Sequence, residues 1–304
     1  MWPGHTFKAL TSLNPVLLKN QLARFQNFCE QLNELKGITL TPHLIPIIKI
    51  YMKHLKQIRL NKFIAMSGVA SRRHADDLIV QGFVRVNGKT ITDLGTRVSP
   101  EQDRVFVQNK PIHAVRDLVY IAFHKPIHVV TTMNDPQGRP SLAEYFSKAR
   151  IRLFPVGRLD WDSEGILLLT NDGAFAQKVS HPKYGVAKTY LAKLSGQPTD
   201  EQLQKLMRGV SIIGGKARAQ YVERIRSSGK YDWVKIIIDE GRNRQIRQMF
   251  QKIGFDVKKL QRVAIGSLRL GALERGKFRI LTETDLEKVF RAPKELTARA
   301  RWLA

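Results

Sequence analysis

The chain has 304 residues, and 43% of them are hydrophobic, which is an ordinary share for a folded protein. This length is sufficient for one large core and suggests two domains. Lysine and arginine together number 51, against 26 aspartates and glutamates, so the formal net charge at pH 7 is +25. Since the hydrophobic share is normal, disorder does not account for this charge. The balance instead indicates a polyanionic partner, either a nucleic acid or an anionic membrane surface.

The membrane surface is the weaker of these two partners. The longest apolar run near the N-terminus, residues 44–52, contains Pro46 and Lys49 and is far too short to span a bilayer. No signal-peptide pattern opens the chain. The single cysteine, Cys29, allows no internal disulfide and fits a reducing cytoplasm. None of the eight histidines shows a paired ligand spacing with this cysteine, so we expect no metal site.

Residues 1–56 differ from the rest of the chain because they are only weakly patterned. A helix-like stretch over residues 16–35 is followed by Pro42 and Pro46, which interrupt the pattern. Met52 stands directly before a strongly patterned segment and could be the natural start of the protein. The alternative is that residues 1–56 are a genuine accessory segment. Neither reading assigns a function to this part of the chain.

Residues 57–110 are predicted to form a small domain. Four apolar residues suit a short helix that Gly68 closes: Leu60, Phe63, Ile64 and Met66. Ser71 is a good N-cap for a second helix through Gln81, in which His74 is the third residue. Residues 83–86 are typical of a strand, Asn87-Gly88 of a tight hairpin turn into residues 89–91, and residues 104–107 of a further strand.

After a predicted linker at residues 111–117, residues 118–290 show a mixed pattern. Strands are expected at residues 119–123, 129–132, 189–194 and 233–238, and helices at 200–208 and 243–253. In the second helix Ile246, Phe250 and Ile253 recur at i, i+4 and i+7 and predict a core-facing stripe. Because strands and helices alternate without regular βαβ repeats, the fold class is α+β. Residues 291–304 form a basic tail that we expect to be loosely held from Pro293 onward.

Residues 155–173, PVGRLDWDSEGILLLTNDG, are the most informative stretch. A Gly-Arg-Leu-Asp sequence at residues 157–160 precedes an apolar run, residues 166–169, that ends in an Asn-Asp-Gly turn. This order places the Asp160 carboxylate on a tight loop that leads into a buried strand. Beside Arg158, in a strongly basic chain, it has the character of a reactive group, although an ordinary turn capped by aspartate is an equal alternative from these residues alone.

The predicted start of the second helix in the small domain carries Arg72 and Arg73. They would offer charged donors and free backbone N–H groups to phosphate, or could simply be a solvated helix end. The complete pattern of helix, Ser-Arg-Arg, helix, strand and Val-Asn-Gly-Lys resembles the ribosomal-protein-S4-like (alpha-L) RNA-binding domain. The resemblance implies that Lys62, Arg72 and Arg73 contact the RNA backbone.

The Asp160 segment resembles the catalytic segment of one family of rRNA pseudouridine synthases, which includes the small-subunit and the B-type large-subunit enzymes. Three further family-like motifs stand in the right order: residues 134–140 (NDPQGRP), 188–190 (KTY) and 240–247 (EGRNRQIR). The resemblance covers residues 57–290. It implies an S4-like domain followed by a mixed, largely antiparallel sheet that carries the catalytic site.

The resemblance also implies roles for individual residues. Asp160 would be the catalytic carboxylate, and Arg247 the arginine beside it that keeps it ionised. The ring of Tyr190 would stack on a flipped uracil. Arg158 would hold the extruded nucleotide, and Ile246 would be both pocket wall and core. Arg244 stands where some relatives carry histidine, and phosphate binding is its expected role.

Pseudouridine formation breaks the N1–C1′ bond of a uridine, turns the uracil and joins C5 to C1′. No redox change occurs and no group is donated, so we expect no cofactor, in keeping with a chain that lacks a convincing nucleotide or metal motif. A carboxylate could attack C1′ as a nucleophile or take a proton from C2′ as a base, and the sequence leaves both routes open. Asp162 and Glu164 could form a two-carboxylate glycosidase arrangement with Asp160, but isomerisation must retain the base.

We therefore predict a cytoplasmic, monomeric rRNA pseudouridine synthase that acts on ribosomal RNA or a pre-ribosomal particle and not on a membrane. Residues 134–140 and 265–286 are more similar to the B-type large-subunit enzymes, which favours 23S rRNA over the small-subunit alternative. Two rivals remain: a non-catalytic rRNA-binding assembly factor on the same fold, and a hydrolase that releases free base. A tRNA synthetase with an appended alpha-L domain would need a nucleotide-binding motif, which the sequence does not contain.

Overall fold

The computed structural model describes residues 57–115 and 117–302. The expectations for residues 1–56, including the alternative start at Met52, lie outside the described residues. Within the described ranges, no helix combines the length and the apolar character that a membrane crossing requires.

The first described part of the chain is a small unit of two helices and short strands. Its helices are α3 (Leu60–Met66) and α4 (Arg72–Val80), which pack against each other. β1 (Ile58–Arg59) pairs with β4 (Arg97–Val98), and a four-stranded sheet has the order β3 (Lys89–Thr90), β2 (Val84–Val86), β5 (Val105–Val107) and β6 (Lys110–Ile112). Both predicted helices are confirmed. The hydroxyl of Ser71 accepts a hydrogen bond from the backbone N–H of His74 at 3.1 Å, so the predicted N-cap is also present.

The predicted hairpin turn is confirmed, and a second one lies beyond it. Asn87 and Gly88 have φ values of 50° and 84°, as a two-residue hairpin turn requires. Gln108 and Asn109 have φ values of 47° and 64° and reverse the chain in the same way without a glycine. As a result, residues 110–112 form β6, and the predicted linker is wrong for residues 111 and 112, which pair with β5.

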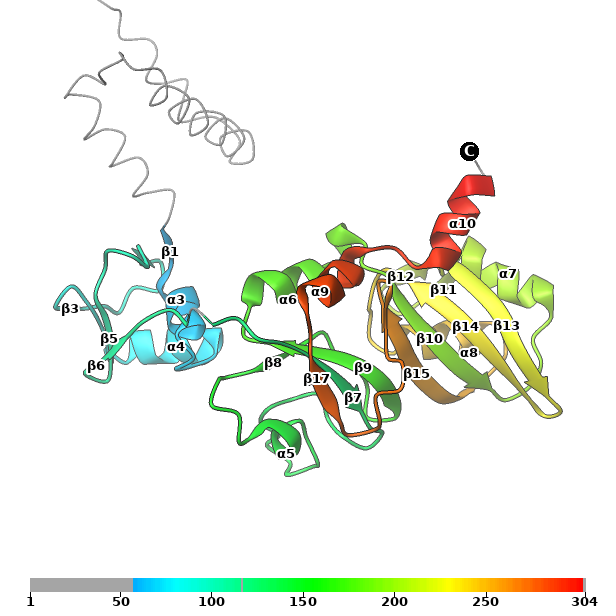
Figure 1. The fold of residues 1–304 in the computed structure, drawn as a ribbon, viewed down its shortest axis with the longest axis horizontal. Coiled ribbons are helices and arrows are strands. Elements are labelled where there is room, and N and C mark those ends of the chain that lie inside the picture. Colours follow the sequence, from blue (N-terminus) through cyan, green and yellow to red (C-terminus); the bar gives the residue numbers. More distant parts are fainter. Residues whose placement is uncertain (1–56, 116, 303–304) are drawn as a thin grey trace, which may run out of the picture. The chain divides into compact units, whose positions relative to one another are not determined.

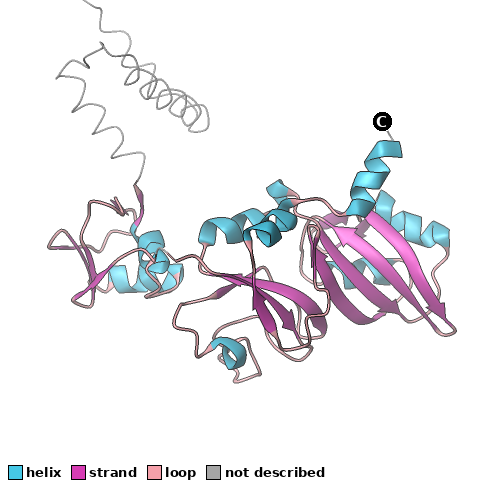
Figure 2. Ribbon diagram, in the orientation of Figure 1, coloured by secondary structure: helices cyan, strands magenta, loops and turns pink. Residues whose placement is uncertain are grey.

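The larger part of the chain is organised around one nine-stranded sheet (Figures 1 and 2). Its main path runs through β13 (Tyr221–Ser228), β14 (Tyr231–Ile238), β10 (Lys188–Leu194), β15 (Val257–Ile265), β9 (Ser163–Thr170), β7 (Tyr120–Lys125) and β17 (Phe278–Ile280). β16 (Leu268–Arg269) pairs with β15, β8 (Phe154–Val156) pairs with β9, and β11 (Val210–Ile212) with β12 (Gly215–Ala217) forms a separate hairpin. The fold class, α+β with a largely antiparallel sheet, is as expected.

Helices cover both faces of this sheet. They are α5 (Ala143–Phe146), α6 (Gly173–Ser180), the 3-10 turn η1 (Pro182–Tyr184), α7 (Asp200–Arg208), α8 (Gln245–Lys252), α9 (Glu283–Phe290) and α10 (Lys294–Trp302). On β9, Leu167 and Leu169 belong to the core that contains α5, α7 and α8, while Ile166 and Leu168 belong to the core that contains α6 and α9. Alternate side chains of a strand point to opposite faces, so the continuous apolar run of residues 166–169 reflects burial on both faces.

The pairing of β15 with β9 is the parallel one in a sheet whose other strand pairs are antiparallel. In this pair Arg262 lies opposite Gly165, which has a φ of +116°. A Cβ atom on Gly165 would lie 2.1 Å from the carbonyl oxygen of Arg262. Glycine is therefore required for the two strands to approach each other at this point.

Two further predictions about this region are wrong. Residues 129–132 were expected to form a strand, but they make only an isolated bridge between Val130 and Ser141. The β-branched residues that suggested a strand have other roles here, since Val129 is buried and the hydroxyl of Thr131 is hydrogen-bonded to the Leu159 carbonyl. The tail was expected to be loosely held, but it forms α10, whose Glu295 is paired at 3.4 Å with Lys235 of β14.

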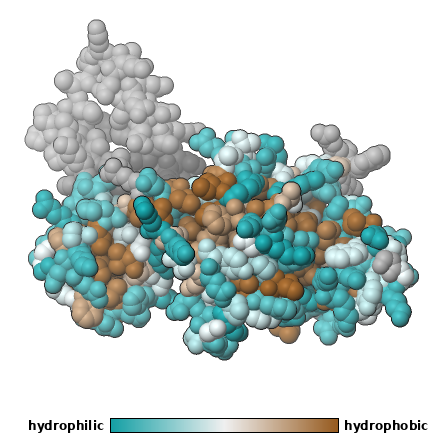
Figure 3. All heavy atoms as spheres, turned by 60° about the horizontal axis from the view of Figure 1, so that its bottom comes forward, coloured by the Kyte–Doolittle hydropathy of each residue, from teal (hydrophilic) through white to brown (hydrophobic). Residues whose placement is uncertain are grey.

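Figure 3 shows one face of the molecule, on which hydrophilic side chains surround hydrophobic patches.

Candidate active site

A pocket of about 340 Å³ lies where β10, β15 and the beginning of β9 meet the N-terminal end of α8. Five of the residues predicted from the sequence line it: Arg158, Asp160, Tyr190, Arg244 and Ile246. These residues come from three segments that are far apart in the sequence. The volume is at the lower end of the range typical of small-ligand sites and suits a single flipped base more than a larger ligand.

The loop that carries Asp160 is fixed by hydrogen bonds on both sides of the aspartate. The backbone N–H of Leu159 donates to the hydroxyl of Thr131 at 3.2 Å, and this hydroxyl donates to the Leu159 carbonyl at 2.6 Å. After the aspartate, the N–H of Ser163 donates to the Asp160 carbonyl at 3.1 Å and starts β9. The Asp160 side chain itself is 27% exposed, so the loop holds it at the pocket without burying it completely.

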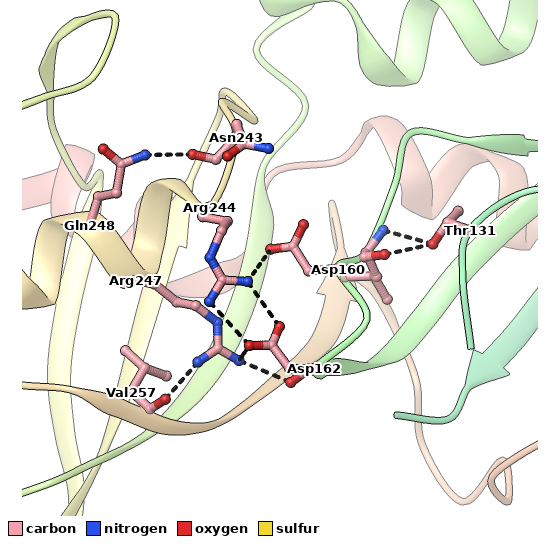
Figure 4. A network of polar contacts seen from close by, with 9 residues as sticks. Thr131, Asp160, Asp162, Asn243, Arg244, Arg247, Gln248 and Val257 are labelled. Carbon is pink, nitrogen blue, oxygen red and sulfur yellow. Dashed lines mark hydrogen bonds and ion pairs between the residues drawn. The ribbon is translucent and has the colours of Figure 1, made fainter. Parts of the chain in front are cut away.

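Two arginines of the 240–247 motif reach this loop (Figure 4). Arg244, which precedes α8 with a left-handed φ of 47°, places a guanidinium nitrogen 4.0 Å from the Asp160 carboxylate. The same side chain donates to both carboxylate oxygens of Asp162, at 3.3 and 3.1 Å. Arg244, for which phosphate binding was the expected role, lies beside Asp160, and its side chain remains 46% exposed.

The expected contact between Arg247 and Asp160 is not made. Arg247 lies within the helix, one turn after Arg244, and its guanidinium is paired at 3.1 Å with the Asp162 carboxylate. It also donates to the backbone carbonyls of Asp162 at 2.9 Å and of Val257 at 2.6 Å. The sequence motif identified the correct helix and face, but the competing carboxylate two residues beyond Asp160 binds this arginine.

Asp162 therefore connects both arginines to the loop. Partial burial opposes ionisation of its carboxyl group, but the hydrogen bond from Arg244 and the positive charges of Arg247 and Arg244 outweigh burial and hold the pKa of Asp162 below its usual value. For Arg247, burial lowers the pKa of the guanidinium, while Asp162 and Asp160 act in the opposite direction. The sequence suggested Asp162 only as a second catalytic carboxylate, and the structure places it in this ion-pair network.

Tyr190 and Ile246 form apolar walls of the pocket. Tyr190 on β10 is 8% exposed and Ile246 on α8 is 4% exposed, and both belong to the large hydrophobic core. Ile246 is therefore both core and pocket wall, as predicted. Arg158 is exposed at the pocket opening.

Three buried cations near the site were not predicted from the sequence: Lys125, Lys188 and Arg262. Lys125 donates to the carbonyls of Pro126 and Val129 at 2.7 and 2.8 Å, and burial lowers the pKa of its ammonium group to about 8, although Asp160 and Asp162 favour the charged form. Lys188 and Arg262 line the pocket itself. Lys188 belongs to the KTY motif, which was the sequence signal that could have placed it near the site. Nothing in the sequence marks Arg262 as a pocket residue.

The predicted RNA-binding residues of the small domain are presented to solvent. Lys62 on α3 and Arg72 and Arg73 at the beginning of α4 are all exposed. Arg72 also donates to the side chain of Asn61 at 3.4 Å, which orients it along α3. In the part of the chain that the structure describes, no group of three or more histidine, cysteine, aspartate or glutamate side chains could hold a metal ion.

The arrangement brings one accessible carboxylate, a facing arginine, an aromatic ring and an aliphatic wall around a pocket of the size of one base. Such a site can bind a flipped nucleotide and attack its sugar, either at C1′ or at the C2′ proton. Each of these functions can be assigned to a side chain that lines the pocket.

Comparisons with known proteins agree with this geometry. Residues 119–252 match the RNA pseudouridylate synthase family, and residues 58–105 match the S4 domain. The ribosomal large subunit pseudouridine synthase B of Bacillus subtilis is 42% identical over 76% of this chain and 95% of its own length. The dual-specificity RNA pseudouridine synthase RluF of Escherichia coli O157:H7 is 35% identical over 80% of this chain and 82% of its own.

A solved structure described as a pseudouridylate synthase superposes with a TM-score of 0.56 and 30% sequence identity, covering 76% of this chain and 99% of the other. The sequence relatives and the fold therefore lead to the same class of enzyme, an isomerase that acts on RNA. The chain belongs to the RNA pseudouridine synthase family, with an S4 domain that precedes the catalytic domain.

Proposed function

We propose that the enzyme converts a specific uridine of large-subunit (23S) ribosomal RNA to pseudouridine and that Asp160 is its catalytic carboxylate. The observation that carries the proposal is the different environment of three neighbouring carboxylates. Arginines bind Asp162 and Glu164 closely, at 3.1 and 2.7 Å. Asp160 lines the pocket, and its nearest ion-pair partner among the described residues is Arg244 at 4.0 Å. Of the three, Asp160 is thus the carboxylate available to a ligand.

The other pocket residues support the same reaction. The guanidinium of Arg244 can balance the charge of Asp160 while the sugar is attacked. The Tyr190 ring can stack on the uracil against the Ile246 wall, and stacking of this kind offsets part of the few kcal/mol that base extrusion requires. Arg158 at the pocket opening is placed to hold the extruded nucleotide. Attack at C1′ and proton removal at C2′ are both compatible with this geometry.

The large-subunit target rests on similarity to the Bacillus subtilis enzyme, whose name assigns it to the large ribosomal subunit. In this proposal residues 57–110 bind rRNA or a pre-ribosomal particle through Lys62, Arg72 and Arg73, and residues 118–290 carry out the reaction. The net charge of +25 adds a long-range, salt-dependent attraction. We expect a monomer that works in the cytoplasm. Residues 291–304 would be a basic terminal segment, and residues 1–56 receive no role.

Mapping pseudouridine in total rRNA tests the proposal. Carbodiimide adducts and reverse-transcription stops would be compared between cells with and without this gene. We expect one large-subunit stop to disappear, to return with the wild-type protein and to stay absent with Asp160→Asn. A lost stop in the small subunit would contradict the target. Restoration of the stop by Asp160→Asn would contradict the role of Asp160, and an unchanged map would favour another RNA or the assembly-factor alternative.

A further inference from the structure

Arg262 is a buried arginine in the wall of the pocket. It is 4% exposed, and its Nε donates to the carbonyl of Ile166 at 2.8 Å. One terminal nitrogen, Nη1, lies 3.4 Å from the hydroxyl of Tyr190. The other, Nη2, is buried and has no hydrogen-bond partner among the described residues. A charged donor left in this state is expensive unless a ligand completes it.

Lys188 is the second buried cation of the same wall. It is 9% exposed, and its ammonium group has one long hydrogen bond, 3.4 Å, to the carbonyl of Asp239. Burial, followed by the charge of Arg262, lowers the pKa of Lys188 to about 8, while Asp239 acts in the opposite direction. The two cations therefore disfavour each other, and a shared anion would reverse this effect.

No carboxylate of the described residues lies within 4.0 Å of either cation. The residues that line the pocket include five basic side chains and two acidic ones, Asp160 and Glu240, and Glu240 is already paired with Arg242 at 3.1 Å. Buried cations without a counterion usually lose their charge or acquire a ligand, and arginine does not lose its charge in proteins. The pocket is thus built to receive negative charge at the side formed by Arg262 and Lys188.

The reaction generates such a charge. When the N1–C1′ bond breaks, its electron pair stays on N1, and the uracil departs as an anion whose charge is shared with O2 and O4. Asp160 either forms a bond to C1′ that is later broken or takes a C2′ proton that it later returns. The turned ring then uses an electron pair at C5 to bond C1′. The C5 proton is lost and one proton is gained at N1, so the product is an isomer of the substrate.

We propose that Arg262 and Lys188 are catalytic residues that stabilise the detached uracil as an anion and hold it in the pocket while it turns; this inference rests on the proposed function. The guanidinium group of Arg262 and the ammonium group of Lys188, which both belong to the pocket lining, bind the carbonyl oxygens of the ring. Tyr190, which Arg262 contacts, supplies the stacking surface. A delocalised anion can keep such contacts as it rotates because its oxygens lie on both sides of the ring.

The experiment compares Arg262→Met, Arg262→Lys, Lys188→Met and the wild type in single-turnover reactions with a saturating excess of enzyme over a target RNA. Loss of one preorganised charge donor typically lowers a rate by about 10²–10³-fold. We expect decreases of this size for the two methionine variants, a smaller one for Arg262→Lys, and RNA affinity within about twofold of the wild type. Lys259→Gln, an exposed lysine on the same strand, is the matched control and should retain the wild-type rate.

A second substrate separates anion stabilisation from a structural role. With 5-fluorouridine at the target position, the electron-withdrawing fluorine makes the departing ring a weaker base, so it needs less help from the protein. The rate of N1–C1′ cleavage is measured for both RNAs, together with the melting temperature of each variant. On the fluorinated RNA, we expect the decrease in cleavage rate caused by Arg262→Met to be about tenfold smaller than on the ordinary RNA. A tenfold difference in rate corresponds to a modest change in the energy of the transition state.

Two results would overturn the inference: rates equal to the wild type at saturating enzyme, which would leave these cations at most a role in RNA binding, or an equal penalty on both RNAs. If Arg262→Met does not fold, the same comparison of cleavage rates on the two RNAs with Lys188→Met and Arg262→Lys still tests the inference. A wild-type enzyme that forms no pseudouridine in any rRNA, or an active Asp160→Asn variant, would instead show that the proposed function had failed.

Discussion

Replacement of Asp162 by asparagine should destabilise the catalytic domain in a way that depends on pH. The carboxylate accepts charged hydrogen bonds from Arg244 at 3.1 Å and pairs with Arg247 at 3.1 Å. Asparagine can keep one neutral acceptor but cannot balance two guanidinium groups. Hydrogen bonds to charged groups contribute about 1.5–3 kcal/mol each. Because the Asp162 side chain is 38% exposed and solvent screens it, we expect a loss of about 1–2 kcal/mol in total.

The pH dependence identifies the cause of this loss. The folded-state pKa of Asp162 lies below the ordinary value of 3.8, so its ionised form stabilises the fold at pH values above 3.8. This contribution declines as the pH falls through the depressed folded-state pKa, where the wild-type carboxyl also becomes neutral. The difference in free energy of unfolding between wild type and Asp162→Asn should therefore be full at pH 7 and shrink toward zero as the pH falls below the folded-state pKa of Asp162.

Urea unfolding at several pH values measures this difference. At pH 7, a loss of 1 kcal/mol corresponds to a decrease of roughly 2–4 °C in melting temperature for a domain of this size. Asp256→Asn serves as the control, because Asp256 pairs at 3.4 Å with an exposed lysine and both partners are more than half exposed. It should change stability by less than about 0.5 kcal/mol. A deficit in Asp162→Asn that persists unchanged in acid would refute the electrostatic reasoning.

Two further predictions concern RNA binding and strand packing. Arg72→Ala combined with Arg73→Ala should weaken RNA binding and reduce the log–log salt slope by roughly one to two units, since each phosphate contact contributes about one; an unchanged slope in filter-binding titrations would remove these arginines from the interface. Gly165→Ala should lower the free energy of unfolding by roughly 3 kcal/mol, because its Cβ would collide with the backbone of Arg262 at an unfavourable φ. Gly173→Ala, with no atom within 4 Å of the added Cβ, should be nearly neutral, and equal effects of the two changes would contradict this explanation.

The parts of the structure that could be predicted from the sequence are those with local causes. The Ser71 cap, the Asn87-Gly88 turn and the apolar stripe of α8 each depend on residues a few positions apart, and all three are present. The Gln108-Asn109 turn was missed because its residues adopt positive φ without the glycine that usually signals it. The order of α10 could not be predicted because it depends on a pairing of Glu295 with Lys235, sixty positions away.

The candidate site also contains some residues that a local motif identifies and others whose position depends on distant parts of the chain. Asp160 could be identified as a candidate because its loop, Arg158 and the following strand form one continuous motif. Arg262 could not, because its importance comes from its position in β15 opposite Gly165 and from the Tyr190 hydroxyl 72 positions earlier in the chain. For a related reason, the motif did not show that Arg247 pairs directly with Asp162 and not with Asp160. A motif indicates which side chains approach the site, but the competition between Asp160 and Asp162 for a cation is decided by the geometry of the folded loop.

The parallel pairing of β9 and β15 explains how these charges come to act together. Asp160, Asp162 and Glu164 alternate along the chain that enters β9, and the described arginines Arg244, Arg247 and Arg275 pair with them. The loop is thereby close to neutral. β15 brings a charge without a counterion alongside it, at the point where Gly165 allows the backbones to touch. Because the loop does not neutralise Arg262, its charge remains available to a ligand in the pocket, as the proposed stabilisation of a negatively charged ring requires.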